Sequence, residues 1–379
     1  MSDASQRVVH ERIRIGFMPL LDAAVPVIAA RAGFARRQGL EIELVRETSW
    51  ANVRDRLAIG HFDAAHLLAP LPIAAAFGLT PYDVPLLAPM VLASGGNAIT
   101  VSRKVWEAMR AADPNVVAND PVSTGRALRG AIEARRERGD PQLAFVVVHP
   151  FSSHNYELRY WLAAAGIDPE RDIAIAILPP PYMGDALAAG RIDGFCVGDP
   201  WNSRAARLGH GAVILTKPAI WPRSPDKVLG VRADWAEANH HLLCRLLAAL
   251  LDSARWCADP VNRDILVSIM SDESVLGVDP QDVLAALSGR MPLADGERLV
   301  PGMLEFEAGE ANRMRAADAR FYAEQMQRWG QVALPEDTAS RLARIFATEA
   351  LEQAALGLGL SFDASADPVE ARLFDRLPR

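Results

Sequence analysis

The chain has 379 residues, half of them hydrophobic and 23% charged, a composition typical of a globular protein long enough for two domains. Its formal net charge of −7 gives no electrostatic reason for direct binding to nucleic acid, and no run of about 18 or more apolar residues predicts a membrane span. The three cysteines, Cys196, Cys244 and Cys257, fit a reducing compartment and do not have the spacing of a zinc site.

The start of the chain is charged and has no apolar segment ahead of the first expected strand. This pattern differs from a secretory signal, and no cysteine lies near the start for lipid attachment. We therefore expect a cytoplasmic protein. The charged positions are Asp3, Arg7, Glu11, Arg12 and Arg14.

Alternating strands and helices are predicted for the first ninety residues, from apolar runs and helical spacing: strands at 13–17, 41–45 and 63–66, helices at 23–32 and 50–59. The segment 91–102 is a first candidate crossing between two halves of the molecule. Gly95 and Gly96 within it allow positive φ and a close approach to a ligand. Further elements are expected after it, namely helices at 104–111 and 122–138 and a buried strand at 145–148.

Residues 151–227 continue the alternation, with strands expected at 173–178, 194–197 and 213–216 and helices between them. This order predicts a parallel α/β sheet, whose ligands bind at the carboxyl ends of the strands. The segment 221–227 is a second candidate crossing. The residues expected at those strand ends are Ser152, Ser153, His154, Pro180 and the loop 197–199.

No strand is expected after residue 234, and the tail 361–379 is polar. Helical spacing predicts helices at 235–257, 263–269, 281–287, 311–329 and 336–356.

Three long motifs carry a family resemblance: H-N-Y-x-L-R-Y-W-L-A-A-x-G-I-D-P from residue 154, then P-P-P-x-M, then D-G-F-C-V-G-D-P-W-N. With them the chain resembles the nitrate- and bicarbonate-binding proteins of ABC uptake systems. Within that family it is most similar to the branch of cytoplasmic nitrate sensors, the NasS group. The resemblance runs from about Ile13 to about Val332.

The resemblance implies a type II periplasmic-binding-protein-like fold, with two α/β lobes, two crossovers and a helical C-terminal block. The expected division is 11–98 for the first part of lobe 1, 99–220 for lobe 2, 221–360 for the return to lobe 1 and the helical block, and 361–379 for the tail.

Two residues carry the expected ligand contacts. His154 can donate to an oxyanion at a helix N-terminus, or can be an imidazole packed on aromatic neighbours; the family places a nitrate-contacting histidine here. Lys227 follows a turn and can simply be solvated. The resemblance implies a nitrate or nitrite contact instead, because bicarbonate binders of the family have an acid at this position and need a cation.

The other expected contacts are smaller. Gly96 and Asn97 could offer a backbone N–H and an amide, or form a hinge turn, and Ser153 stands at the helix start. Pro180 and Val197 would shape a small dry pocket, or pack as ordinary strand ends. Two positions depart from the family pattern of nitrate transporters, which have a tryptophan near Leu67 and a glutamine at Tyr182.

The resemblance implies a nitrate or nitrite sensor that controls a NasT-like antiterminator with an RNA-binding ANTAR domain. A solute-binding component of a nitrate-type ABC transporter is the alternative, and an enzyme of the thiamine-pyrimidine synthesis type is a third. Cys196 lies in an apolar strand without an activating partner, and no paired-carboxylate, zinc-protease or phosphate-loop pattern occurs. We therefore expect no enzymatic activity, cofactor, metal or direct nucleic-acid contact.

Overall fold

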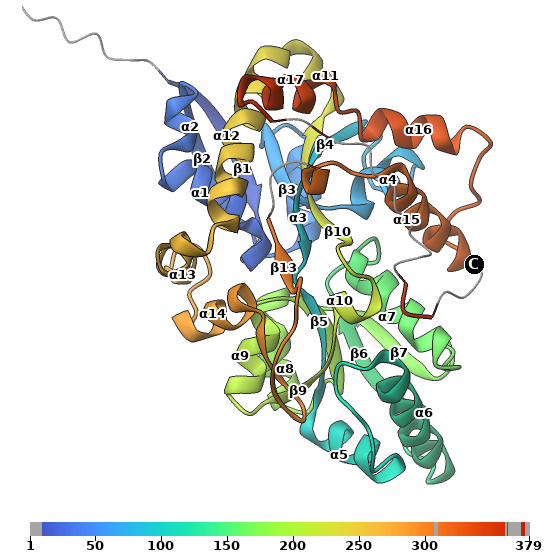
Figure 1. Ribbon diagram of the computed structural model, residues 1–379. Helices are drawn as coiled ribbons and strands as arrows, with labels where there is room; N and C mark the ends of the chain where they lie inside the picture. The colour runs from blue at the N-terminus through green and yellow to red at the C-terminus, as the bar shows by residue number, and fades with distance from the viewer. Residues whose placement is uncertain (1–9, 307–309, 361, 363–372, 376–379) are drawn as a thin grey trace, which may run out of the picture.

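Two sheets, each covered by helices, form two lobes that lie one above the other in Figure 1. The computed structural model describes residues 10–306, 310–360, 362 and 373–375. The first sheet has the order β13-β4-β10-β3-β1-β2. Its strands are β1 (Glu11–Phe17), β2 (Leu40–Arg46), β3 (Ala64–Leu68), β4 (Leu86–Gly95), β10 (Pro225–Arg232) and β13 (Leu304–Glu305).

The second sheet has the order β12-β11-β9-β5-β8-β6-β7, with β6, β7 and β8 parallel and β5 antiparallel to its neighbours. Its strands are β5 (Asn97–Ser102), β6 (Leu143–Val147), β7 (Ile173–Ile177), β8 (Gly194–Gly198), β9 (Gly211–Thr216), β11 (Arg290–Leu293) and β12 (Gly296–Leu299).

Local sequence explains where several helices begin. Ser49 and Ser152 accept hydrogen bonds from the backbone N–H three residues later, which caps the helices after them. Asp120 does the same for its helix, which then starts with Pro121. The helices of the first half are α1 (Ala24–Arg31), α2 (Phe34–Arg37), α3 (Trp50–Ala58), α4 (Pro70–Ala76), α5 (Arg103–Ala112), α6 (Pro121–Glu137), α7 (Ser153–Ala164), α8 (Met183–Ala188) and α9 (Trp201–Arg207).

The second half is mostly helical, as expected. Its helices are α10 (Lys217–Ile220), α11 (Ala233–Ala238), α12 (His240–Ala258), α13 (Arg263–Ser271), α14 (Pro280–Ser288), α15 (Ala316–Arg328), α16 (Thr338–Ile345) and α17 (Glu349–Gly357). Short 3-10 turns occur at η1 (Leu21–Ala23), η2 (Pro180–Tyr182), η3 (Pro260–Asn262) and η4 (Glu310–Asn312).

The first crossing between the sheets is a single residue, Gly96, between β4 and β5. Gly95 and Gly96 have φ of +78° and +84°, a conformation that disfavours any side chain. A Cβ on Gly95 would lie 2.5 Å from the carbonyl oxygen of Met303. Positive φ therefore favours glycine at both positions. At Gly95 glycine also leaves room for the backbone of Met303, just before β13. The second crossing leads from α10 to β10 through residues 221–224.

The predicted fold class is confirmed, but the expectation of no strand after residue 234 is wrong. β11 and β12 form a hairpin at the edge of the second sheet, and β13 pairs with β4 in the first. β12 is exposed at all four positions and β13 has two residues, so neither has the apolar alternation that marks a strand. The chain thus visits the second sheet again before β13 returns it to the first.

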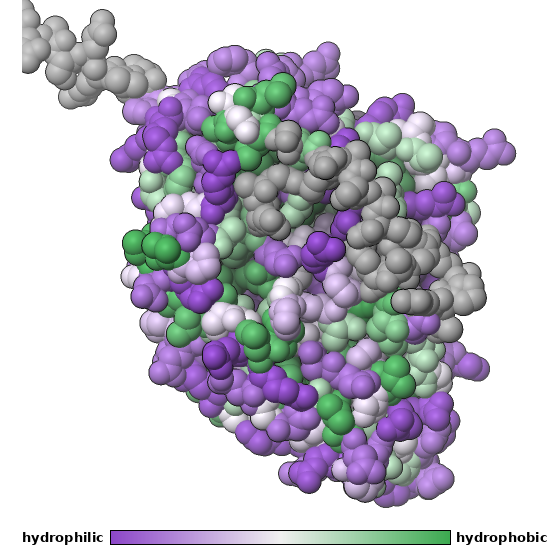
Figure 2. All heavy atoms as spheres, viewed as in Figure 1, coloured by the Kyte–Doolittle hydropathy of each residue, from purple (hydrophilic) through white to green (hydrophobic). Residues whose placement is uncertain are grey.

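Two expected helices are each divided in the structure. α11 and α12 meet at Asn239 within the expected 235–257 helix, and α16 and α17 replace the expected 336–356 helix. The tail 361–379 lies mostly outside the described residues. Among the described residues, none of the helices combines the length and apolar composition needed to cross a membrane. Hydrophilic side chains cover most of the face in Figure 2, with hydrophobic ones in small separate groups.

Candidate functional site

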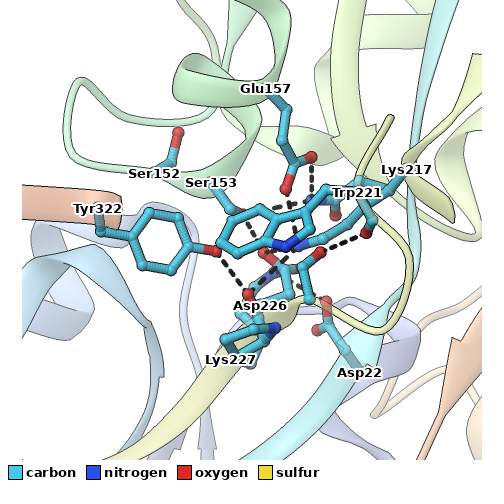
Figure 3. A network of polar contacts seen from close by, with 12 residues as sticks. Asp22, Ser152, Ser153, Glu157, Lys217, Trp221, Asp226, Lys227 and Tyr322 are labelled. Atoms are coloured by element: carbon cyan, nitrogen blue, oxygen red, sulfur yellow. Dashed lines mark hydrogen bonds and ion pairs between the residues drawn. The ribbon is translucent and has the colours of Figure 1, made fainter. Parts of the chain in front are cut away.

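A cluster of polar side chains lies buried where the two lobes meet (Figure 3). None of them is more than 3% exposed. Because an unpaired buried charge costs several kcal/mol, such a cluster persists only when its charges face one another. Its members are Asp22 (η1), His66 (β3), Asn97 (β5), Ser153, His154 and Glu157 (α7), Lys217 (α10), and Asp226 and Lys227 (β10).

Two of the three lysines in the chain belong to this cluster, although the chain has 40 basic residues. Lys104 is exposed, whereas Lys217 and Lys227 are fully buried. Lysine presents a compact point charge where arginine presents a broad planar fork. The cluster therefore uses a basic residue that is rare in the rest of the chain.

Lys227 lies in the middle of the first sheet, because β10 pairs with β3 on one side and β4 on the other. Its Nζ is 2.8 Å from Oδ2 of Asp22, contacts the carboxylate of Asp226, and lies 5.5 Å from the ring centroid of Trp50. Burial works to lower the pKa of Lys227, but the two carboxylates outweigh it and raise the pKa above its usual value. Lys227 is therefore a charged, buried residue and not a solvated one.

Asp22 also contacts His66, whose Nε2 is 2.9 Å from Oδ1 of the carboxylate. Burial lowers the pKa of His66 more than Asp22 raises it, so the imidazole is neutral near pH 7 and donates its Nε2 proton. Burial opposes ionisation of Asp22, but Lys227 and His66 lower the pKa of this carboxyl below its usual value. Asp22 is therefore an anion held between a cation and a donor.

The second lobe supplies the other half of the cluster. Nζ of Lys217 lies 2.8 Å from Oε1 of Glu157 and 3.6 Å from Oδ1 of Asp226. The Asn97 amide donates to Oε2 of Glu157 at 3.2 Å and to Ser153 Oγ at 3.3 Å, and Ser153 Oγ donates to Asp226. Asp226 therefore links the lysines of the two lobes.

Burial acts in the same direction on the pKa of Glu157 and Asp226, but the lysines offset it to different extents. Burial raises the pKa of Glu157, and Lys217 reverses only part of that effect. Burial also works to raise the pKa of Asp226, but Lys217 and Lys227 together hold it well below its usual range.

Neither ring nitrogen of His154 has a hydrogen-bond partner among the described residues. His66 differs from it, because its Nε2 faces the carboxylate of Asp22. His154 lies fully buried in the first turn of α7. Burial, and then the charge of Lys227, lower its pKa to about 3, so the ring is neutral near pH 7. Leaving a buried polar group unpaired costs about 1–3 kcal/mol. A buried, unpartnered donor at a helix N-terminus beside a lysine is an arrangement that can receive an anion.

The other predicted ligand contacts are Gly96, Asn97, Pro180 and Val197. The N–H of Gly96 donates to the carbonyl of Met303 at 2.5 Å, so this N–H is already used and the residue serves the hinge turn. Asn97 uses its amide nitrogen within the cluster, while its Oδ1 has no partner among the described residues. Pro180 and Val197 are buried, at η2 and in β8. The structure therefore brings four of the predicted site residues together in the cluster, namely His154, Lys227, Asn97 and Ser153.

The sequence prediction missed five members of the cluster. A polar residue inside an apolar segment was an available signal for Asp22 and His66, in L-L-D-A-A and A-A-H-L-L. Of the two departures from the family pattern, Leu67 is buried in β3 beside His66, whereas Tyr182 is 56% exposed and lies at the surface. The missed members are Asp22, His66, Glu157, Lys217 and Asp226.

Two sheets are linked at Gly96 and at residues 221–224, and a buried polar cluster lies where they meet. This is the architecture of the class of two-lobed solute-binding proteins. Comparison with solved structures agrees. The periplasmic nitrate-binding protein NrtA from Synechocystis PCC 6803 superposes with a TM-score of 0.83, over 92% of this chain and 89% of that one, at 24% identity.

The chain belongs to the NMT1-like family, which it matches over residues 7–271, and to the nitrate- and bicarbonate-type solute-binding proteins of ABC systems. It is 31% identical to the nitrate/nitrite binding protein NrtA of Synechococcus elongatus, over 93% of this chain and 80% of the relative. It is 34% identical to the bicarbonate transport ATP-binding protein CmpC of the same species, over 97% of this chain and 52% of the relative. The chain thus spans about half the length of such longer relatives.

Proposed function

We propose that the chain binds nitrate or nitrite at the lobe junction. The observation that carries the proposal is His154, a buried imidazole at the start of α7 and near Lys227, whose two nitrogens have no hydrogen-bond partner in the part of the chain that the structure describes. The anion would accept a hydrogen bond from the ring and face the lysine charge across a dry interior. Relatives named as nitrate/nitrite binding proteins support this ligand class.

Lys227 supports nitrate over bicarbonate. A bicarbonate site of this family would have an acid at this position and a cation to hold the ligand. Among the residues that the structure describes, no group of three or more His, Cys, Asp or Glu side chains could hold a metal ion. A monovalent anion held by a lysine and a neutral histidine needs no such ion.

The test is isothermal titration with nitrate, nitrite, bicarbonate and sulfate. We expect one-to-one binding of nitrate or nitrite and no binding of sulfate. Because the chain has only three lysines, selective 15N labelling of lysine provides a second measurement. Nitrate should shift the side-chain signals of Lys217 and Lys227 and leave that of Lys104 in place. Binding of bicarbonate alone would refute the proposal.

We further propose that the chain is a cytoplasmic sensor that holds a NasT-like antiterminator and releases it when the anion binds. The motifs shared with the sensor branch support this role. A solute-binding component of an ABC importer is the alternative, supported by relatives named as transport proteins. Co-purification decides between them: recovery of an ANTAR-domain protein, lost on addition of nitrate, supports the sensor, and recovery of a membrane permease supports the importer.

No catalytic residue is proposed. The relatives NrtA and CmpC are named as binding and transport proteins, which supports a binding role over an enzyme of the thiamine-pyrimidine synthesis type.

A further inference from the structure

The buried cluster contains more carboxyl groups than ammonium groups. Among the described residues, the ammonium groups that face Asp22, Asp226 and Glu157 are those of Lys217 and Lys227, so full ionisation would leave one negative charge in excess. All five side chains are at most 3% exposed, so water does little to stabilise that excess. A further buried carboxyl, Asp199, follows β8, and burial raises its pKa to about 7 against the opposing hydrogen bonds from Ser203.

An entering anion would make this imbalance worse. Nitrate carries its own charge into a region that already holds an excess of carboxylate. His154 does not compensate, because its ring is neutral near pH 7. A buried charge without compensation either fails to enter or is neutralised by a proton on a nearby group.

We propose that each anion enters the junction together with one proton, which Glu157 retains. Glu157 lies on α7 three residues after His154, and residues at this spacing share a face of a helix. This inference rests on the proposed binding of nitrate or nitrite, and it adds how the same site is regulated by pH.

The surroundings of Glu157 suit a carboxyl that gains and loses a proton. Lys217 faces one oxygen from α10, the Asn97 amide faces the other from β5, and Asp226 and Cys196 stand nearby on β10 and β8. Both carboxyl oxygens face donors, which suits the ionised form. The protonated form needs an acceptor, and Asn97 can supply one.

Oδ1 of Asn97 has no partner among the described residues. Rotation of the amide by half a turn would place this oxygen against the Glu157 O–H, in place of the amide nitrogen. The cluster thus contains an acceptor for the proposed proton without any movement of the backbone.

The direction of the pH effect follows from linkage. The anion stabilises protonated Glu157, so the pKa of this carboxyl is higher in the complex than in the free protein. Nitrate affinity is therefore greatest below the free-protein pKa. It falls as pH rises, by up to about tenfold per pH unit, until the pKa of the complex is passed.

The test is titration with sodium nitrate in two buffers of different ionisation enthalpy, at several values between about pH 6 and 9. The difference in heat gives the number of protons taken up, which should rise towards one at the upper end. Glu157→Gln should take up none and bind with an affinity independent of pH. Glu157→Asp should still take up a proton when nitrate binds. Its nitrate affinity also shows whether the site tolerates a shorter acidic side chain.

Two controls locate the proton. Glu133→Gln changes an exposed acid on α6, and Asp199→Asn removes a buried carboxyl outside the cluster; both should leave the uptake unchanged. Equal heats in both buffers at every pH would overturn the inference, as would uptake that persists in Glu157→Gln. Those outcomes leave nitrate binding itself intact, whereas absence of binding by any tested anion would refute the proposed function.

Discussion

Lys227 Nζ lies 2.8 Å from Asp22 Oδ2, and this contact ties the second lobe crossing to the first turn after β1. A ligand that approaches Lys227 must therefore compete with a carboxylate that already holds it. A small anion gains from this site only the difference between its own contacts and those it displaces.

Lys227→Glu should abolish nitrate binding, with a loss of at least about 100-fold in affinity, because a charge-assisted contact becomes a repulsion between acids. Isothermal titration measures the loss. Lys104→Glu makes the same charge change at an exposed position and should leave the affinity unaltered. Unchanged affinity in Lys227→Glu would exclude this residue from the site.

His154→Leu should remove nitrate binding while the unliganded protein keeps its stability or gains up to about 1–3 kcal/mol. The reason is that an apolar side chain of similar size replaces a buried imidazole whose nitrogens have no hydrogen-bond partner among the residues described. Thermal unfolding with and without nitrate gives both results. A large drop in stability would show that the imidazole is part of the core and not a vacant ligand contact.

Asp226→Asn should destabilise the protein by about 1–3 kcal/mol, because Lys217 and Lys227 lose the carboxylate that they share but keep Glu157 and Asp22. The folded-state pKa of Asp226 lies well below its unfolded value of about 4. Its contribution is therefore complete above about pH 4 and is lost as pH falls towards the folded pKa. Denaturant unfolding at neutral and acid pH should show a smaller pH effect in the variant. Asp234→Asn, at an exposed acid, should cost less than about 1 kcal/mol.

Gly95→Ala should be far more damaging than Gly139→Ala. Both residues have positive φ, +78° and +71°, so both variants lose about 1–2 kcal/mol from backbone strain. Only at Gly95 does the added methyl group also collide, with the carbonyl of Met303. Chemical unfolding should give a clearly lower free energy of unfolding for Gly95→Ala than for Gly139→Ala. Equal free energies would mean that the backbone at the first crossing shifts to accommodate the methyl group at little cost.

Nitrate affinity should fall when the proposed antiterminator partner is present in saturating amounts. If nitrate releases the partner, the partner must weaken nitrate binding by the same factor, typically 5- to 150-fold for couplings of about 1–3 kcal/mol. In this proposal α15 would carry the coupling. Tyr322 on it donates to the carbonyl of Pro225 at 2.5 Å, and Gln331 beyond it accepts from Tyr156 on α7 at 2.7 Å. Equal nitrate affinities with and without partner would rule the linkage out.

Local signals in the sequence predicted the alternation of strands and helices and the segments of the first two crossings, whereas the division into two lobes was implied by the family resemblance. Apolar runs marked β6 and β8, and a pair of glycines marked the first crossing. The ion-pair cluster could not be predicted in this way. Asp22 and Lys227 are 205 positions apart, and Lys217 meets Glu157 across 60 positions, so their pairing depends on the tertiary fold.

β13 and Asn312 cover part of the outer side of β4, and this cover bears on the solubility of the protein. In the first sheet β4 is next to the edge, and β13 pairs with only its last two residues. Asn312 donates to the carbonyl of Val91 further along the same strand, at 2.9 Å. A chain cut after residue 300 would present the hydrogen-bonding groups of β4 to other molecules. Such an unprotected strand promotes intermolecular pairing, so the shortened protein should form aggregates at concentrations where the full chain stays monodisperse.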